Sequence, residues 1–426
     1  MVFKSMATSK LFASIFVAPN TSISLQTVFI LLILLVFPGF SLTIDQAINL
    51  AKESNPALAK AKRQAAAAGA ATVQKSWLAS PILMLEYQQI PPGSSNLADA
   101  EMRMYGLAQN IPWPNKLWLK RSAALQAENA VKYEVQDYSW QLRAQVVEAY
   151  FQLYFAQKKL ELNQANLGIV KGLEKVSESK YLVGRAAQVD LLSAQVEAAV
   201  LENNDLTLEE EFGLAEIRGK KLLNTQEAFV TESDPTFLIV LPGLTSLKAS
   251  ALANNPKLLA IKAEVSVRQN LHDLAKAELL PDFKTTWLQR ENAAGPAGWD
   301  LKFALEIPLW FWTDAAKIRQ AGYEVEGSAN FLLDYQNALK EKVASEFVGL
   351  SNALRSAKVY REVIVPKATQ ALGSARTAYL TDKLDFFTLL GTQRQLLNVQ
   401  LKYYDNLVMA QIHKARLEAL IGGELK

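Results

Sequence analysis

The chain carries the same unit twice, and this duplication constrains its fold more than any other feature. Matching residues recur with an offset of 196 to 200 positions: Asn55-Pro56 and Asn255-Pro256, Pro81 and Pro281, Ile111-Pro112 and Ile307-Pro308, Tyr181-Leu182 and Tyr379-Leu380, Arg218 and Arg416. A period near 200 is too long for a solenoid, whose repeats span about 20–50 residues. We therefore expect a first structural repeat over 42–226, a linker over 227–242 and a second repeat over 243–426.

Each repeat predicts the same order of elements. A short helix ends at Asn-Pro, because the residue before proline disfavours the helical region, and proline then opens a second helix at its first position. Pro81 and Pro281 mark a change from helical periodicity to alternation, which predicts β-hairpins at about 82–111 and 282–307. The second hairpin alternates most clearly: Trp299, Leu301, Phe303 and Leu305 interleave with Asp300, Lys302, Ala304 and Glu306.

A very long helix follows each hairpin. The helical patterns at about 114–178 and 311–377 each cover about 65 residues, or roughly 100 Å at 1.5 Å per residue. Shorter return helices follow at about 187–224 and 384–421. A return helix and the helix before the hairpin, stacked end to end, nearly match the long helix. We expect a mainly α fold with a small β part, built from two long helical hairpins and two β-hairpins.

The first 41 residues predict a secretory signal peptide. Lys4 and Lys10 are the only charged residues before Asp45, and ten apolar residues, 28–37, end at Pro38-Gly39. Ten residues are too few to span a bilayer, which takes about 20. Small residues at 39 and 41 favour cleavage after Ser41. An uncleaved N-terminal anchor is the alternative.

Composition excludes several functions. The 426 residues carry 45 Lys and Arg against 42 Asp and Glu, so the net charge of +3 does not favour binding to nucleic acid. The chain has no Cys and two His, which excludes thiolate metal sites, disulfides and cysteine nucleophiles. Neither His272 nor His413 lies in a recognisable catalytic motif. We expect a protein that is not an enzyme and has no cofactor or resident metal.

The two hairpins predict a membrane barrel shared between chains. Four strands with one apolar face cannot lie in lipid as an open sheet, because unpaired edges cost several kcal/mol per group. Bacterial single-chain barrels have at least 8 strands, whereas this chain supplies only four, so three chains would give twelve. A soluble α+β protein or a soluble periplasmic coiled-coil scaffold is the alternative.

The doubled order of elements resembles the TolC family of outer membrane efflux proteins. The strongest local match is Tyr181-Leu182-Val183-Gly184-Arg185, followed by Val189-Asp190-Leu191-Leu192. The resemblance covers about 42–422. It implies a homotrimer with a 12-stranded barrel in the outer membrane lipid and a helical tunnel in the periplasm. It also implies partners, namely a periplasmic adaptor and an inner-membrane pump. Type I protein secretion is an alternative use of the same duct.

The resemblance places the functional residues at the tips of the helical hairpins. It implies adaptor docking at the two turns, through Val183, Gly184, Arg185, Thr381, Asp382 and Lys383. It also implies an entrance constriction, for which the candidates are Tyr181, Asp190, Tyr379, Asp382 and Asp385. The aspartates have a second interpretation as N-caps of the return helices.

Two further groups of residues follow from the pattern. Gly168 and Pro366 occupy matching positions in the long helices, where they predict a bend or weak point. Aromatic residues after the hairpins predict contact with the membrane interface: Trp113, Trp118, Trp310 and Trp312. Met84, Met102 and Met104 lie on strands, where packing or a thioether path for soft metals would explain them. The exported substrate stays open, with metal ions or small molecules favoured.

Overall fold

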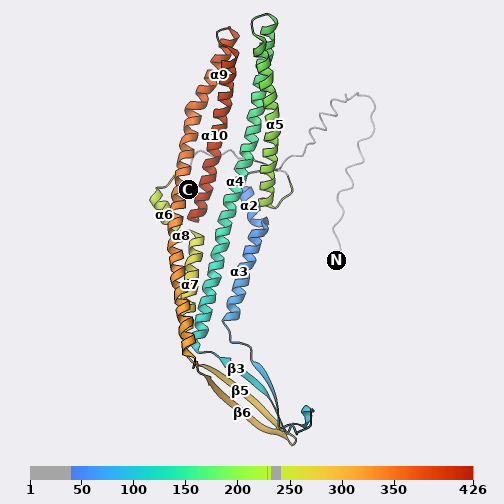
Figure 1. Ribbon diagram of the computed structural model, residues 1–426, viewed down its shortest axis with the longest axis vertical. Helices are drawn as coiled ribbons and strands as arrows, with labels where there is room; N and C mark the ends of the chain where they lie inside the picture. The colour runs from blue at the N-terminus through green and yellow to red at the C-terminus, as the bar shows by residue number, and fades with distance from the viewer. Residues whose placement is uncertain (1–39, 228, 232–240, 426) are drawn as a thin grey trace, which may run out of the picture.

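The computed structural model is an elongated molecule with a sheet at one end and a helical tip at the other (Figure 1). It describes residues 40–227, 229–231 and 241–425. The first half of the chain contains β1 (Phe40–Leu42), α2 (Ile44–Ser54), α3 (Pro56–Lys75), β2 (Ile82–Gln88), η1 (Leu97–Asp99), β3 (Met102–Ile111), α4 (Pro114–Leu182), α5 (Gln188–Leu223) and, in the predicted linker, β4 (Phe229–Thr231). The second contains α6 (Leu244–Asn254), α7 (Pro256–Ala277), β5 (Asp282–Asn292), β6 (Gly295–Glu306), α8 (Phe311–Val359), η2 (Tyr360–Ile364), α9 (Val365–Leu380) and α10 (Phe386–Ile421).

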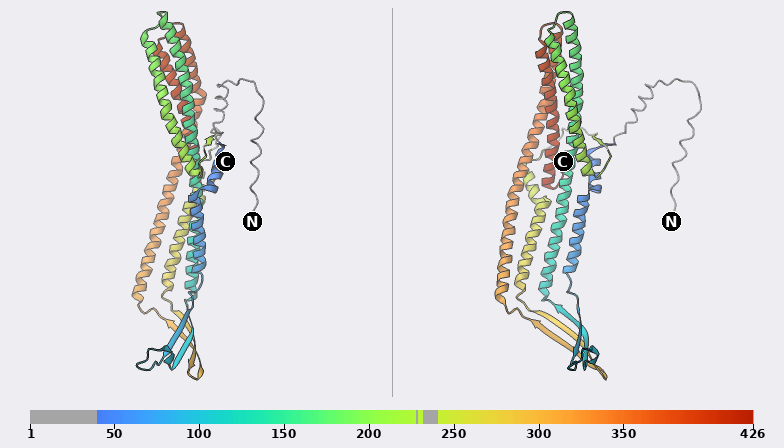
Figure 2. Two further views of the ribbon diagram at one scale, coloured as in Figure 1. Left: turned by 90° about the vertical axis from the view of Figure 1, so that its right-hand side faces the viewer. Right: turned by 45° about the vertical axis from the view of Figure 1, so that its right-hand side comes forward.

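The helices form a single layer whose members change along its length. Near the sheet, neighbouring helices follow the order α3, α4, α7, α8 (Figure 2). Towards the tip, the order is α5, α4, α10, α9. The outer helices of the layer are therefore α3 and α8 near the sheet, and α5 and α9 near the tip. Among the described residues, no helix combines the length and apolar character of a membrane span.

The predicted end-to-end stacking of helices depends on the two Asn-Pro pairs. The Asn55 side chain accepts the N–H of Leu58 at the start of α3 and donates to the Leu222 carbonyl, 3.1 Å away, at the end of α5. Asn255 repeats this arrangement with Leu258 and with Leu420 at the end of α10. Each asparagine thus satisfies both an N-terminal donor and a C-terminal acceptor, which helix ends otherwise leave unpaired. Both side chains are buried.

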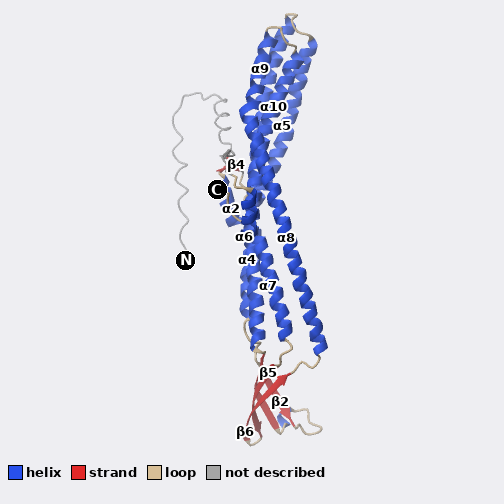
Figure 3. Ribbon diagram, turned by 90° about the vertical axis from the view of Figure 1, so that its left-hand side faces the viewer, coloured by secondary structure: helices blue, strands red, loops and turns tan. Residues whose placement is uncertain are grey.

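The four longer strands form one antiparallel sheet in the order β2-β3-β5-β6 (Figure 3). The two hairpins meet through β3 and β5, where Ile111 lies opposite Phe283. Gly106 allows this contact, because a Cβ there would stand only 1.8 Å from the Trp287 carbonyl oxygen. β2 and β6 each have an open edge within the chain. The second hairpin turns tightly, since its strands reach Asn292 and resume at Gly295.

A small parallel sheet and two short helices surround the middle of the molecule. β1 pairs with β4, and α2 and α6 pack beside the long helices, where one apolar core joins the first repeat to α10 and a second lies within the second repeat. The predicted cleavage after Ser41 would remove two of the three residues of β1. Most of the predicted signal peptide, 1–39, and most of the linker, 228 and 232–240, lie outside the described residues, so both boundaries stay predictions.

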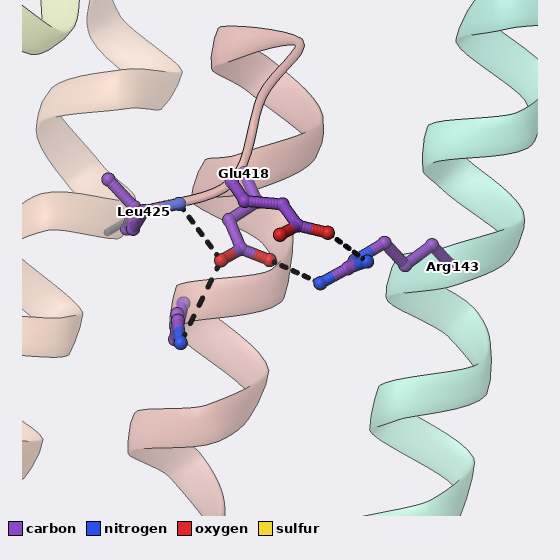
Figure 4. A network of polar contacts seen from close by, with 5 residues as sticks. Arg143, Glu418 and Leu425 are labelled. Atoms are coloured by element: carbon purple, nitrogen blue, oxygen red, sulfur yellow. Dashed lines mark hydrogen bonds and ion pairs between the residues drawn. The ribbon is translucent and has the colours of Figure 1, made fainter. Parts of the chain in front are cut away.

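A polar cluster joins α4 to the C-terminal segment at this level (Figure 4). The buried Glu418 carboxylate accepts the N–H of Leu425, 3.1 Å away, and lies 3.4 Å from an Arg143 nitrogen. Arg143 also pairs with Glu424 at 2.7 Å. Burial raises the pKa of Glu418 above its ordinary value, although Leu425, Lys414 and Arg143 act in the opposite direction.

The raised pKa predicts a pH-dependent stability. Because the folded state binds the Glu418 proton more tightly than the unfolded chain, stability is full below about pH 4.5 and falls as pH rises through the raised pKa. Each unit of difference is worth about 1.4 kcal/mol. We expect Glu418→Gln to remove this slope from thermal unfolding midpoints measured between pH 4.5 and 8. Glu424→Gln, at an exposed neighbour whose charge makes the smallest contribution to the raised pKa, should retain most of the slope, and an unchanged slope in Glu418→Gln would contradict the assignment.

Candidate functional site

The two turns at the helical tip share one backbone conformation despite their different sequences. Gly184 has φ 74° and its N–H donates to Tyr181 O at 2.9 Å. Asp382 has φ 58° and its N–H donates to Tyr379 O at 3.2 Å. Aspartate tolerates the left-handed region better than most residues, which explains how it replaces glycine. The six residues predicted for adaptor docking, 183–185 and 381–383, are all exposed in these turns, and docking stays a prediction.

A clasp joins the two helical hairpins directly below the turns. The Lys180 ammonium donates to the carbonyl oxygen of Tyr379 and to the carboxylate of Asp382. It also lies 4.4 Å from the centre of the Tyr379 ring. The hydroxyls of Ser177 and Tyr379 are 3.0 Å apart, and both side chains are buried. The end of α4 therefore holds the end of α9 through a buried pair of hydroxyls and through an ammonium whose carboxylate partner, Asp382, is exposed.

The clasp involves only one of the two repeat-related tyrosines. Tyr379 is 4% exposed and packs edge-on against Phe386, whereas Tyr181 is 40% exposed. The repeats differ at the two residues that hold Tyr379. The positions that match Ser177 and Lys180 in the second repeat are Ala375 and Ala378. Alanine offers neither a hydroxyl nor an ammonium, so the second repeat cannot hold Tyr181 in the same way. Comparing the repeats at these positions is the sequence signal that would have identified Lys180 and Ser177.

The three candidate aspartates have different surroundings. Asp385 caps α10, since it accepts the N–H of Thr388 at 2.9 Å, and the hydrogen bond from the Thr388 hydroxyl lowers the pKa of Asp385. The hydrogen bond from Lys180 lowers the pKa of Asp382, so this pair stays charged until the pH falls below the ordinary range of aspartate. Asp190 is half-buried in the first turn of α5, whose N-cap is Ala187. The capping interpretation therefore fits Asp385 and does not fit Asp190.

The return helices make further contacts between the hairpins below the clasp. Arg394 of α10 forms two hydrogen bonds to the buried Glu197 of α5. Gln393 of α10 donates to the buried Asn166 of α4. These pairs align the two coiled pairs of helices. In the described part of the chain, no group of three or more His, Cys, Asp or Glu side chains is arranged to hold a metal ion.

The two predicted helix breakers behave differently. α4 is continuous through Gly168. The second long helix changes to a π-helical turn at Tyr360–Ile364, and Pro366 follows after Val365. A π-helical turn before proline accommodates the missing N–H, because the backbone hydrogen bonds shift by one residue. A weak point at Gly168 and at Pro366 stays a prediction. Of these two positions, only Pro366 lies beside an irregular helical turn.

Aromatic residues gather where the helices meet the sheet, at the end opposite to the clasp. Trp118, Trp310 and Trp312 are exposed, as lipid contact requires. Trp113 is half-buried and stacks on Phe283 with ring centres 5.5 Å apart, so it also fastens the two repeats together. Trp77, near the end of α3, is the most exposed of the tryptophans and was absent from the predicted set. Its repeat partner is Ala277, so the duplication gave no signal for it.

The sequence matches the outer membrane efflux protein family over residues 47–224 and 247–423, which are the two repeats. The chain belongs to this family. Each match contains one complete series of helices and strands, as the internal duplication predicts. The family is one of transport channels rather than enzymes.

Individual relatives agree with this assignment. The cobalt-zinc-cadmium resistance protein CzcC of Cupriavidus metallidurans is 24% identical over an alignment of 391 residues that covers 88% of each chain. The solved structure of CusC has a TM-score of 0.79 at 15% identity and is matched over 92% of its length by 89% of this chain. The open-state MtrE channel of Neisseria gonorrhoeae has a TM-score of 0.76 at 15% identity, with 90% of this chain and 89% of that chain covered.

These similarities confirm the family and the fold class expected from the sequence. The mainly helical architecture with a small sheet is that of outer membrane channels, and the predicted outer-membrane location and efflux role are those of the family. The closed 12-stranded barrel is a property of an assembly, and it stays a prediction for this chain.

Proposed function

We propose that this chain forms the outer-membrane duct of a tripartite efflux system, as a homotrimer that receives small molecules or metal ions from a periplasmic adaptor and an inner-membrane pump. The observation that carries the proposal is that, in the described part of the chain, the outer strands and the outer helices leave both sides of the layer as open edges. A layer with two unlike open edges is completed by further copies of itself, arranged head to tail in a ring.

The sheet supports closure into a ring. β2 and β6 are its outer strands, and three successive antiparallel pairings place them in opposite directions. β6 of one chain can therefore continue the antiparallel sheet with β2 of the next. Three chains contribute twelve strands, so every edge in the membrane finds a partner.

The outer helices support the same closure. Apolar side chains are exposed along α5, at spacings of three and four residues in its first half: Val189, Leu192, Val196, Val200, Leu206, Leu214 and Ile217. The opposite edge exposes a second series, from α8 to the end of η2: Phe311, Trp312, Tyr323, Phe331, Val348, Val359 and Val363. Exposed apolar rows of this length are typical of protein interfaces. Both apolar rows would be covered if α5 of one chain packed against α9 of the next, and α3 against α8.

The helical tip is the proposed entrance. The exposed turns, 183–185 and 381–383, are suited to contact an adaptor, and the clasp of Lys180 on Tyr379 holds the two hairpins of each chain together. Three clasps around one axis would keep the entrance narrow. Tyr181 and Asp190 are the remaining constriction candidates, since Asp382 and Asp385 are engaged by Lys180 and Thr388.

Metal resistance is the favoured use, because the relative from Cupriavidus metallidurans is named for cobalt, zinc and cadmium resistance. Deleting the gene should increase the sensitivity of the host to such metals, or to small toxic molecules, and the plasmid-borne chain should restore tolerance. Loss of a secreted protein without any change in sensitivity would instead favour type I secretion. A host with unchanged export of every kind would overturn the proposal.

A further inference from the structure

The two open edges of the layer carry opposite charges in both halves of the molecule. The tip half of the first edge, residues 188–217 of α5, has eight acidic residues and no Lys or Arg. The tip half of the second edge, residues 351–380, has five Lys and Arg residues and one acidic residue. Near the sheet the signs are reversed. There α3 has four Lys and Arg residues and no acidic residue, whereas residues 320–341 of α8 have four acidic residues and one Lys.

Three charged residues point outward from the first edge. Glu210 lies four positions from both Leu206 and Leu214, which belong to the exposed apolar row of α5. Residues three or four apart share one face of a helix. Lys60 and Arg63 share a face of α3 in the same way, and both are exposed. Among the residues that the structure describes, none of these three charged side chains forms an ion pair, so all three are available to a neighbour.

Two residues of opposite charge point outward from the second edge, both on α8. Asp334 follows the exposed Phe331 by three positions, and Arg355 precedes the exposed Val359 by four. Both charged side chains are exposed, and neither forms an ion pair within the described part of the chain. Phe331 and Val359 belong to the apolar row of this edge. A neighbouring chain that covers the row therefore also covers Asp334 and Arg355.

A contact between α3 and α4 fixes the height of Lys60 along the molecule. The Thr72 hydroxyl of α3 donates to the carbonyl oxygen of Ala124 in α4, 3.2 Å away. The two helices are antiparallel, and Lys60 lies twelve residues before Thr72. Because both helices rise by the same amount per residue, Lys60 is level with about residue 136 of α4.

α7 lies between α4 and α8 and relates this level to the second edge. Lys257 of α7 pairs with Glu134 of α4 at 3.1 Å. Two residues earlier on α7, the Asn255 Oδ1 atom lies 3.5 Å from the hydroxyl of Tyr335 in α8. Asp334 is the neighbour of Tyr335 in the sequence. It therefore lies on the second edge at the height that the basic pair of α3 occupies on the first.

α10 lies between α4 and α8 in the tip half and relates their levels there. Arg416 of α10 pairs with Glu148 of α4 at 2.8 Å. Three residues nearer the tip, the His413 Nδ1 atom lies 2.6 Å from a carboxylate oxygen of Glu346 in α8. Residue 151 of α4 is therefore level with about residue 346 of α8.

Glu210 and Arg355 also lie at one height. Glu211, next to Glu210, pairs with Lys159 of α4 at 2.8 Å, eight residues beyond the matched position on α4. The same step along α8 reaches about residue 354, next to Arg355. Each edge thus presents one sign of charge where the other edge presents the opposite sign, once near the sheet and once towards the tip.

We propose that the partner of each edge is the opposite edge of a second copy, recognised by charge: Lys60 and Arg63 of one chain pair with Asp334 of the next, and Glu210 pairs with Arg355. This inference rests on the proposed duct and identifies the surfaces that join its chains. Because the sign of each edge reverses halfway along the molecule, a neighbour displaced by half a length would bring like charges together. The charges therefore set the register of the chains, since electrostatic complementarity mainly provides specificity.

Chemical cross-linking tests this register, because the natural chain has no Cys. α4 and α7 separate Lys60 from Asp334 within one chain (Figure 2), so a link between the two positions requires a neighbour. We expect Lys60→Cys/Asp334→Cys, treated in outer membranes with a short bifunctional maleimide, to give covalent dimers and trimers on a denaturing gel. Lys60→Cys/Arg319→Cys is the matched control. Arg319 is exposed on α8 but lies roughly 22 Å nearer the sheet, so this pair should not cross-link.

Charge reversal tests the pairing itself. Asp334→Lys places like charges opposite each other and should make the trimer dissociate in detergent about tenfold faster or more. Lys60→Glu/Arg63→Glu should have a similar effect. Combining all three substitutions restores opposite charges and should recover most of the wild-type rate. Such recovery would show that the single reversal weakens the interface rather than the folding of the chain.

Two results would overturn the pairing. One is equal cross-linking through positions 319 and 334, and the other is a triple variant that dissociates as fast as Asp334→Lys. The mass of the same preparations reports on the duct separately. A trimer with either result would exclude the charge pairing and leave the duct intact. Specific cross-links that join more than three chains would instead support the pairing and contradict the trimeric duct.

Discussion

Replacing Lys180 with alanine and Tyr379 with phenylalanine should open the entrance of the duct. Lys180→Ala removes the ammonium that holds the Tyr379 carbonyl, and Tyr379→Phe leaves the buried Ser177 hydroxyl without its partner. An unsatisfied buried group costs about 1–3 kcal/mol, and 1.4 kcal/mol corresponds to a factor of about ten in an equilibrium. We expect the open population of each chain to rise by about tenfold or more.

Permeability measures this change directly. Cells expressing the double variant should take up a large antibiotic that the outer membrane normally excludes, and the purified channel should conduct more in planar bilayers. Lys383→Ala is the matched control, because it removes a positive charge from the adjacent turn, where the side chain is exposed. If the double variant and Lys383→Ala conduct equally, the clasp does not close the entrance.

The second large effect is expected where the sheet joins the helices. The Lys116 ammonium, 5% exposed, lies 2.7 Å from both the Asp282 carboxylate and the Leu280 carbonyl. Asp282 also accepts the N–H of Trp113. This cluster connects α4 of the first repeat to β5 of the second. Removing one partner of a buried ion pair lowers the free energy of unfolding by about 3–5 kcal/mol. Because Asp282 is partly exposed, we expect Lys116→Met to lower it by an amount at the lower end of that range.

Thermal unfolding of the assembled protein tests this value. Lys116→Met should lower the unfolding temperature and the resistance of the oligomer to detergent, whereas Lys120→Met, one turn further along α4 and exposed, should change neither. Lys116→Met/Asp282→Asn should recover part of the loss, because no buried charge then remains unpaired. A stability equal to that of the wild type in Lys116→Met would show that the cluster does not hold the repeats together.

The architecture was predictable because local sequence patterns determine its elements and each pattern occurs twice. Asn-Pro pairs mark helix ends, alternation marks the strands, and uninterrupted helical periodicity marks α4 and α8. The family resemblance added the assembly. The structure extends the Asn-Pro prediction, since Asn55 and Asn255 also bind the carbonyls of Leu222 and Leu420 in helices that end nearby.

The contacts between repeats were not predictable, because the partners are far apart in the sequence. Lys180 meets Asp382 across 202 positions, and Lys116 meets Asp282 across 166. No periodicity relates such pairs. The near-symmetry of the sequence also favours equal roles for Tyr181 and Tyr379, whereas two substitutions to alanine make their surroundings different. The positions at which the repeats differ, rather than those at which they match, distinguish Tyr379 from Tyr181.

The proposed duct requires that three chains join through their open edges. The mass of the assembled protein tests this claim most directly. We expect the chain, extracted from the outer-membrane fraction with detergent and measured by light scattering or native mass spectrometry, to have the mass of three chains. A monomer that is recovered from the periplasm without detergent would contradict both the ring and the shared barrel.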